Sequence, residues 1–164
     1  MTDKIATRDA YGQALVELGK INSKVVVFDA DLSGATKTNA FQKAFPDRHY
    51  NAGIAEMSMA GLATGMAACG KIPFISTFAV FGTGRIYDMV RNSICYPKMN
   101  VKLALTHAGL TVGEDGATHQ MLEDVALMNA LPNMTIFVPA DAEEAKQAIF
   151  TAAELDGPVY IRLG

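Results

Sequence analysis

Residues 25–31 read Val-Val-Val-Phe-Asp-Ala-Asp, an unbroken apolar and β-branched run with two carboxylates close behind it. A run without polar alternation is typical of a strand that is buried on both faces of a parallel sheet. Ligands of such sheets bind beyond the carboxyl ends of the strands. The stretch therefore predicts an α/β fold with a ligand site close to Asp29 and Asp31.

Similar apolar runs recur along the rest of the chain, with helical segments between them. These further strands are expected at Ile72–Phe78, Val101–Thr106, Met134–Val138 and Val159–Leu163. No linker rich in Pro, Gly or Ser interrupts the alternation, and 164 residues are too few for two ordinary domains. We expect residues 1–164 to form a single domain, a doubly wound and mostly parallel sheet of the six-strand class with helices on both faces.

Three helices have clear signals in the sequence. Thr7 is placed to cap a first helix, whose apolar stripe runs from Tyr11 to Leu18. Asp141 and Glu144 form a capping box before another helix. The helix expected over residues 55–70 is crowded with glycine and alanine, although each glycine costs a helix about 1 kcal/mol. Small residues allow close packing either inside the domain or against the same helix of a second subunit, and both interpretations stay open.

Composition excludes several classes of protein. The net charge is −3 and the basic residues are scattered, unlike the basic patch of a nucleic-acid-binding protein. Cys69 and Cys95 have no CxxC or Cys/His spacing, which argues against a zinc site or a disulfide framework. Without a leader-like start or a long apolar run, the chain is expected to be soluble, cytoplasmic and independent of membranes. It also lacks GxSxG, GxGxxG and GxxxxGK[ST], so no motif supports an acyl hydrolase, a dinucleotide site or a P-loop.

Two segments could form a pocket for a flat ligand. Glu56 begins the small-residue helix, where a glutamate is ordinarily solvated and stabilised by the helix dipole. Its apolar neighbours in residues 51–57 favour a partly desolvated carboxyl that stays protonated and donates a hydrogen bond. Phe78 ends a predicted strand and Phe81 follows it, and burial in the core is the ordinary explanation for two rings at such a place. Stacking on a heteroaromatic ligand is the alternative.

The densest concentration of chemical groups is the segment His107-Ala-Gly-Leu-Thr-Val-Gly-Glu-Asp-Gly-Ala-Thr-His119. Its glycines and acidic residues would suit an ordinary βα connection. We favour a functional loop, because it holds two of the three histidines and rigid scaffolds often carry function on such loops. Its spacing lacks HExxH or another compact ligand set, so no metal site is expected. The third histidine, His49, is expected to be exposed.

Several motifs, taken together and in order, resemble the pyrimidine-binding (middle) domain of the transketolase family. The similarity rests on Gly53-Ile54-Ala55-Glu56, Ser76-Thr77-Phe78 and Gly113-Glu114-Asp115-Gly116-Ala117-Thr118-His119-Gln120. Further matches are Ala6-Thr7-Arg8, Asp29-Ala30-Asp31-Leu32, Leu131-Pro132-Asn133 and Pro139-Ala140-Asp141. The resemblance covers essentially the whole chain, and it implies the thiamine diphosphate-binding fold with that cofactor.

By this resemblance, Glu56 contacts the ring nitrogen N1′ of the cofactor's aminopyrimidine and shares a proton with it. Phe81, assisted by Phe78, packs on the same ring, and Asp31 lies near the cofactor across a subunit interface. The cofactor carries the difficult chemistry, and the protein supplies binding and proton transfer.

The resemblance also assigns residues to a sugar phosphate substrate. His107, Asp115 and His119 would contact its hydroxyl groups, and the two histidines would relay hydroxyl protons near neutral pH. Arg8 would hold the phosphate, since a guanidinium binds phosphate with two parallel hydrogen bonds.

Two positions depart from the family pattern, Met57 where many transketolases have His and Gly84 where a further pocket aromatic is common. The family's diphosphate and Mg²⁺ motif, GDG followed later by Asn, does not occur in the sequence. The chain ends at Gly164, short of a further family arginine. We therefore expect the C-terminal section of a split transketolase or a domain of a longer chain. Mg²⁺ and the diphosphate would be bound mainly by an N-terminal partner subunit or domain.

The resulting function is transfer of a two-carbon ketol unit between sugar phosphates, by a chain that is catalytically incomplete alone. A homo-oligomer, such as a dimer, is expected through the small-residue helix. The alternatives are a 1-deoxyxylulose-5-phosphate synthase-like domain, a 2-oxo acid dehydrogenase β-type domain, or a non-catalytic assembly domain of the same fold.

Overall fold

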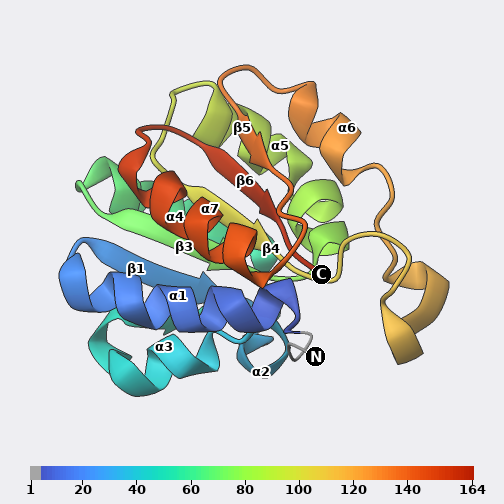
Figure 1. Ribbon diagram of the computed structural model, residues 1–164. Helices are drawn as coiled ribbons and strands as arrows, with labels where there is room; N and C mark the ends of the chain where they lie inside the picture. Colours follow the sequence, from blue (N-terminus) through green and yellow to red (C-terminus); the bar gives the residue numbers. More distant parts are fainter. Residues whose placement is uncertain (1–4) are drawn as a thin grey trace.

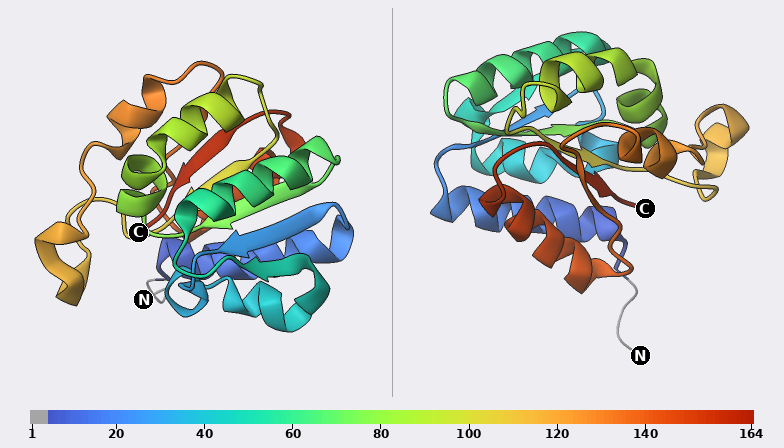
Figure 2. Two further views of the ribbon diagram at one scale, coloured as in Figure 1. Left: turned by 180° about the vertical axis from the view of Figure 1, so that it is seen from behind. Right: turned by 90° about the horizontal axis from the view of Figure 1, so that it is seen from above.

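A computed structural model describes residues 5–164 and shows three layers, with a central sheet between two layers of helices (Figures 1 and 2). The strands are β1 (Val25–Asp29), β2 (His49–Asn51), β3 (Ile72–Ser76), β4 (Lys102–Leu105), β5 (Thr135–Phe137) and β6 (Val159–Arg162). The helices are α1 (Thr7–Ile21), α2 (Ser33–Thr36), α3 (Asn39–Ala44), α4 (Glu56–Ala68), α5 (Tyr87–Met89), α6 (Asp124–Asn129) and α7 (Ala142–Glu154). Four short turns of 3₁₀ or π-helix complete the chain: η1 (Pro46–Arg48), η2 (Val80–Arg85), η3 (Val90–Cys95) and η4 (Gly113–Thr118).

The sheet has six strands in the order β2-β1-β3-β4-β6-β5, and every neighbouring pair is parallel. This confirms the predicted fold class. The central strands β1, β3 and β4 are buried along their whole length, as their largely apolar sequences indicated. Asp29 is the last residue of β1 rather than the first residue after it. Phe78 lies beyond the end of β3, where it forms an isolated bridge with Thr106.

Each face of the sheet carries its own apolar core. On one face, α1 and α7 pack together with α3 and the sheet, and the predicted stripe on α1 is buried there. On the other face lie α4, the η2–α5–η3 segment and α6. The helices therefore flank the sheet on both sides, and the carboxyl ends of the central strands remain open for a site.

The predicted cap of α7 is confirmed and the predicted cap of α1 is wrong. The Asp141 side chain accepts a hydrogen bond from the Glu144 amide at 2.9 Å, as in a capping box. Helix α1 begins at Thr7 itself, and its capping residue is Ala6. The Thr7 hydroxyl instead donates to the Gly164 carbonyl and accepts from the Gly164 amide, so it joins the two ends of the described chain.

The prediction that His49 is exposed is also wrong. His49 is buried, and its Nε2 lies 2.8 Å from Oδ2 of the fully buried Asp29. Strand β2 runs along β1 with Val27 opposite His49, which places the imidazole diagonally beside the carboxylate two residues further on. The two groups are at ion-pair distance, but the orientation of the two atoms does not make a hydrogen bond. Within residues 5–164, no helix is both long and apolar enough to cross a membrane.

Candidate functional site

The candidate side chains come from segments that lie far apart in the sequence. Glu56 is the first residue of α4, Phe78 and Phe81 follow β3, and His107 follows β4. Strand ends of a parallel sheet meet at one edge, so the fold gathers these segments there. The observed topology therefore brings the segments that carry these side chains to the edge of the sheet where the sequence predicted a site.

Glu56 and Phe81 are linked by an arginine. The Arg85 Nη1 donates to both carboxylate oxygens of Glu56, at 2.9 Å each. The carbon of the same guanidinium lies 4.3 Å from the centroid of the Phe81 ring. Glu56 is only 5% exposed, whereas the Arg85 side chain is 50% exposed. A nearly buried carboxylate and one aromatic face therefore border the same position, which a planar cationic group fills.

The two phenylalanines join Glu56 to the histidines. The rings of Phe78 and Phe81 are nearly parallel, with centroids 5.9 Å apart. Phe78 stacks on His107 with centroids 3.9 Å apart, and Phe81 meets His119 edge-on at 5.5 Å. Phe78 is buried and Phe81 is half-buried, so only the second ring offers much surface to a ligand.

The protonation of His107 follows from its hydrogen bonds. Nε2 lies 3.2 Å from Nη1 of Arg8, which can only donate, so Nε2 accepts. The proton is therefore on Nδ1, which donates to the Thr106 hydroxyl at 2.8 Å. Burial lowers the pKa of His107 below 6.5, the Arg8 charge lowers it further, and the Asp115 carboxylate opposes both effects. The imidazole is consequently neutral at pH 7.

Asp31 is held by a pair of reciprocal hydrogen bonds with Asn51. The Asn51 amide nitrogen donates to the Asp31 carboxylate at 3.0 Å, and the Asn51 side-chain oxygen accepts from the Asp31 amide at 3.1 Å. The same oxygen accepts from the Gly53 amide, three residues before Glu56. Asp31 and His107 both have left-handed backbones, with φ of 64° and 59°. Such conformations are strained for these residues and cluster at functional sites.

Asp115 lies apart from the other candidates. It belongs to η4, which projects away from the body of the molecule in Figures 1 and 2. Its side chain is exposed, and its charge acts on His107. His119 follows η4, and its Nδ1 lies 2.9 Å from the Thr118 hydroxyl, which leaves Nε2 for another partner.

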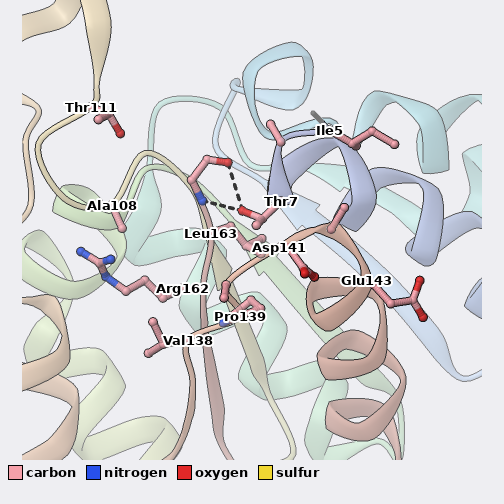
Figure 3. A pocket seen from close by; sticks show the side chains of 14 residues that line it. Ile5, Thr7, Ala108, Thr111, Val138, Pro139, Asp141, Glu143, Arg162 and Leu163 are labelled. Atoms are coloured by element: carbon pink, nitrogen blue, oxygen red, sulfur yellow. Dashed lines mark hydrogen bonds between the residues drawn. The ribbon is translucent and has the colours of Figure 1, made fainter. Parts of the chain in front are cut away.

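A hollow of about 730 Å³ lies elsewhere, between the start of α1, the turn before α7 and the end of β6 (Figure 3). Its lining includes Thr7 and Arg162 but none of the candidate side chains. The Arg162 Nε donates to the buried carboxylate of Asp124 at 2.7 Å, and the Tyr160 hydroxyl donates to the same oxygen at 2.6 Å. These contacts join α6 to β6, which gives Arg162 a structural role.

Sequence reasoning missed Arg85 and Asn51. The sequence around Arg85 suggests at most a fragment of a phosphate loop, and its contact with Glu56 spans 29 residues of sequence. Asn51 stands out in the sequence only as a neighbour of Glu56. In residues 5–164, no three His, Cys, Asp or Glu side chains are close enough together to hold a metal ion.

The sequence matches the family described as the transketolase pyrimidine-binding domain over residues 3–164. The chain belongs to the transketolase family. A transketolase C-terminal section from Methanocaldococcus jannaschii is 54% identical over 156 residues, which cover 95% of this chain and 49% of that protein. A 6-deoxy-6-sulfo-D-fructose transketolase subunit from a Clostridium species is 39% identical over 95% of this chain and 48% of its own length.

The fold is similar to solved transketolase structures. A split-gene transketolase solved as an inactive β4 tetramer is 61% identical, with a TM-score of 0.88 over 98% of this chain and 52% of that one. A transketolase from Campylobacter jejuni is 32% identical, with a TM-score of 0.90 over 98% of this chain and 26% of that chain. The chain therefore spans about half of the split transketolase sections and about a quarter of the one-chain enzyme.

Within this transketolase domain, five of the predicted side chains form one continuous series of contacts when Arg85 is included. The series runs from Glu56 through Arg85, Phe81 and Phe78 to His107 and Arg8. His119 meets the two phenylalanine rings edge-on, beside this series. Asp31 and Asp115 stand outside it. At Gly84, where the sequence departs from the pattern expected by resemblance, an added β carbon would meet no other atom within 4 Å.

Proposed function

We propose that residues 1–164 form a single domain that supplies the aminopyrimidine-binding half of a thiamine diphosphate-dependent transketolase site. The observation that carries this proposal is the pairing of a nearly buried carboxylate, Glu56, with the half-buried ring of Phe81 across one planar position. An aminopyrimidine ring suits this position, because it is flat, bears ring nitrogens that can bond to the carboxylate, and stacks on aromatic faces. The residues present therefore fit this part of the cofactor.

Glu56 is the proton-sharing group of the proposed site. When bound, the cofactor supplies a carbon nucleophile for cleaving and forming C–C bonds. Glu56 holds a proton at N1′ of the aminopyrimidine, and its low exposure keeps water from competing for that hydrogen bond. The aminopyrimidine ring stacks on Phe81, and the buried ring of Phe78 packs against Phe81 from the core. Asp31, fixed by Asn51, borders the same region at an interface between subunits.

His107, His119 and Arg8 face the substrate in this proposal. The Nδ1 proton of neutral His107 is engaged by Thr106 and its Nε2 accepts from Arg8, so a substrate hydroxyl reaches Nε2 by displacing that Arg8 contact. Arg8 keeps further N–H groups for a phosphate while one contacts His107. His119, with Nε2 available, contacts another hydroxyl, and Asp115 reaches the sugar from the projecting η4 segment.

The same domain requires a partner for the remainder of the site. Three residues around α4 expose apolar side chains: Ile54 is 80%, Met57 50% and Leu62 55% exposed. A β carbon added at Gly65 would meet no atom outside the neighbouring turns of its own helix within 4 Å, so that side of α4 is open to another backbone. An exposed apolar surface beside Glu56 favours association, either with a second copy of this chain or with the subunit that binds diphosphate and Mg²⁺.

Reconstitution tests the proposed function. The full subunit that contains this domain is mixed with the diphosphate-binding subunit, thiamine diphosphate and Mg²⁺. Ketol transfer from a ketose phosphate to an aldose phosphate is then measured. We expect cofactor binding and transfer only when both polypeptides are present. Robust transfer by this subunit alone, or no cofactor binding by the complex, would contradict the proposal. Product analysis separates transketolase from a pyruvate-dependent synthase and from a 2-oxo acid dehydrogenase.

A further inference from the structure

Arg85 makes the same two contacts that the proposed function assigns to the aminopyrimidine ring. Its guanidinium is planar, donates to both oxygens of Glu56 and lies over the face of Phe81. The two groups cannot fill one position at the same time. Arg85 must therefore leave this position before an aromatic ring can stack on Phe81 and bind Glu56.

We propose that Arg85 occupies the aminopyrimidine position of the unloaded domain and that its displacement is a built-in step of cofactor loading. This inference rests on the proposed function. Arg85 stabilises the unloaded form, because it pairs a carboxylate that would otherwise be nearly buried without a partner. It thereby opposes loading, and the energy for its displacement comes from the diphosphate contacts of the partner subunit.

The geometry makes this displacement feasible. The Arg85 side chain is half exposed, so its ion pair with Glu56 is partly screened by water and is weaker than a fully buried pair. Arg85 is the last residue of η2 and follows Gly84, where an added β carbon would meet no atom within 4 Å. The guanidinium therefore has solvent and unfilled space beside it when it leaves Glu56.

Calorimetric titration of the reconstituted complex with thiamine diphosphate and saturating Mg²⁺ tests the inference. Arg85→Gln should bind the cofactor roughly 2- to 5-fold more tightly than the natural complex, since it removes the competing, partly screened ion pair. Arg85→Lys keeps the charge but loses the planar fork, and its affinity should lie between the two. The matched control is Arg91→Gln, which removes one exposed charge from the adjoining segment and should leave the affinity unchanged.

The unloaded subunit provides a second measurement, independent of cofactor. Its urea midpoint should fall for Arg85→Gln and stay constant for Arg91→Gln, because only the first change leaves Glu56 without its partner. Equal or weaker cofactor binding by Arg85→Gln, with the natural complex binding normally, would overturn the role of Arg85 and leave the proposed function intact. Failure of the natural complex to bind cofactor would overturn both.

Discussion

Lys102 offers a quantitative test of how the centre of the sheet is held together. It is fully buried at the start of β4, and its ammonium donates to the carbonyls of Leu155 and Gly157 at 2.7 Å each. These bonds fix the turn before β6 against β4, the strand that leads to His107. Burial lowers the pKa of Lys102 from 10.5 to about 8, and the nearby Asp156 carboxylate opposes the change.

The sign of the resulting pH dependence follows from proton binding. Between pH 8 and 10.5 the unfolded chain keeps the Lys102 proton and the folded chain loses it. Unfolding then takes up a proton, so the free energy of unfolding rises with pH. The full change corresponds to about 3 kcal/mol. Raised pKa values of Cys95, Tyr11 and Tyr160 act in the opposite direction above about pH 9, because their folded forms hold protons longer.

A comparison with Lys102→Met isolates the lysine, since the other three groups titrate in both proteins. Urea unfolding at pH 7.5, 9.0 and 10.5 gives the free energy of unfolding of each. The natural protein should gain about 3 kcal/mol relative to Lys102→Met across this range. A difference that stays constant with pH would mean that Lys102 keeps an ordinary pKa, and the reasoning from its burial would be refuted.

Two further predictions concern the site. Arg8→Gln should raise the pKa of His107, measured by NMR titration of its ring proton, because it removes the second cause of the lowered value; Arg8→Lys should change it less. An unchanged pKa would mean that the Arg8 charge does not act on the imidazole. Phe81→Leu should weaken thiamine diphosphate binding by the complex roughly 2- to 10-fold, the range expected for a lost aromatic stack, whereas Phe45→Leu, in the other core, should not. Equal losses in both variants would count against stacking on Phe81.

Much of the fold was predictable because its central strands have a strong local signal. The strands β1, β3 and β4 are apolar apart from Asp29, Ser76 and Lys102, and a doubly covered sheet buries such strands on both faces. Strand β2 reads His-Tyr-Asn and has no such signal, so it was absent from the predicted set. Its place depends on pairing with β1, which is a tertiary contact.

The wrong predictions for His49 and Thr7 also arise from tertiary contacts that the local sequence does not encode. His49 is buried because β2 pairs with β1 and sets its ring beside Asp29, 20 positions earlier, and no local pattern encodes that pairing. Thr7 has the right type for a cap, but its hydroxyl is taken by Gly164 at the far end of the chain. Both contacts exist only after the chain has folded.

The candidate site was predictable where chemical groups are concentrated in one segment. The loop from His107 to His119 stands out by composition, and the start of α4 stands out because a carboxyl interrupts a run of small apolar residues. Arg85 could not be assigned in this way, since an arginine after a glycine has many solvated roles. Its role follows from its contacts with Glu56 and Phe81, which form only when the sheet topology brings these residues together.

The central claim is that Glu56 shares a proton with the bound aminopyrimidine. Glu56→Gln preserves the size and polarity of the side chain but removes its ionisable group. In the reconstituted complex at saturating cofactor, exchange of the cofactor's C2 proton for deuterium is followed by NMR after acid quench. We predict that the exchange rate and the turnover of Glu56→Gln fall together by about 10²-fold or more, the effect expected when acid–base catalysis is lost. Exchange and turnover that both stay near the natural values would show that Glu56 is a structural residue and would contradict this account.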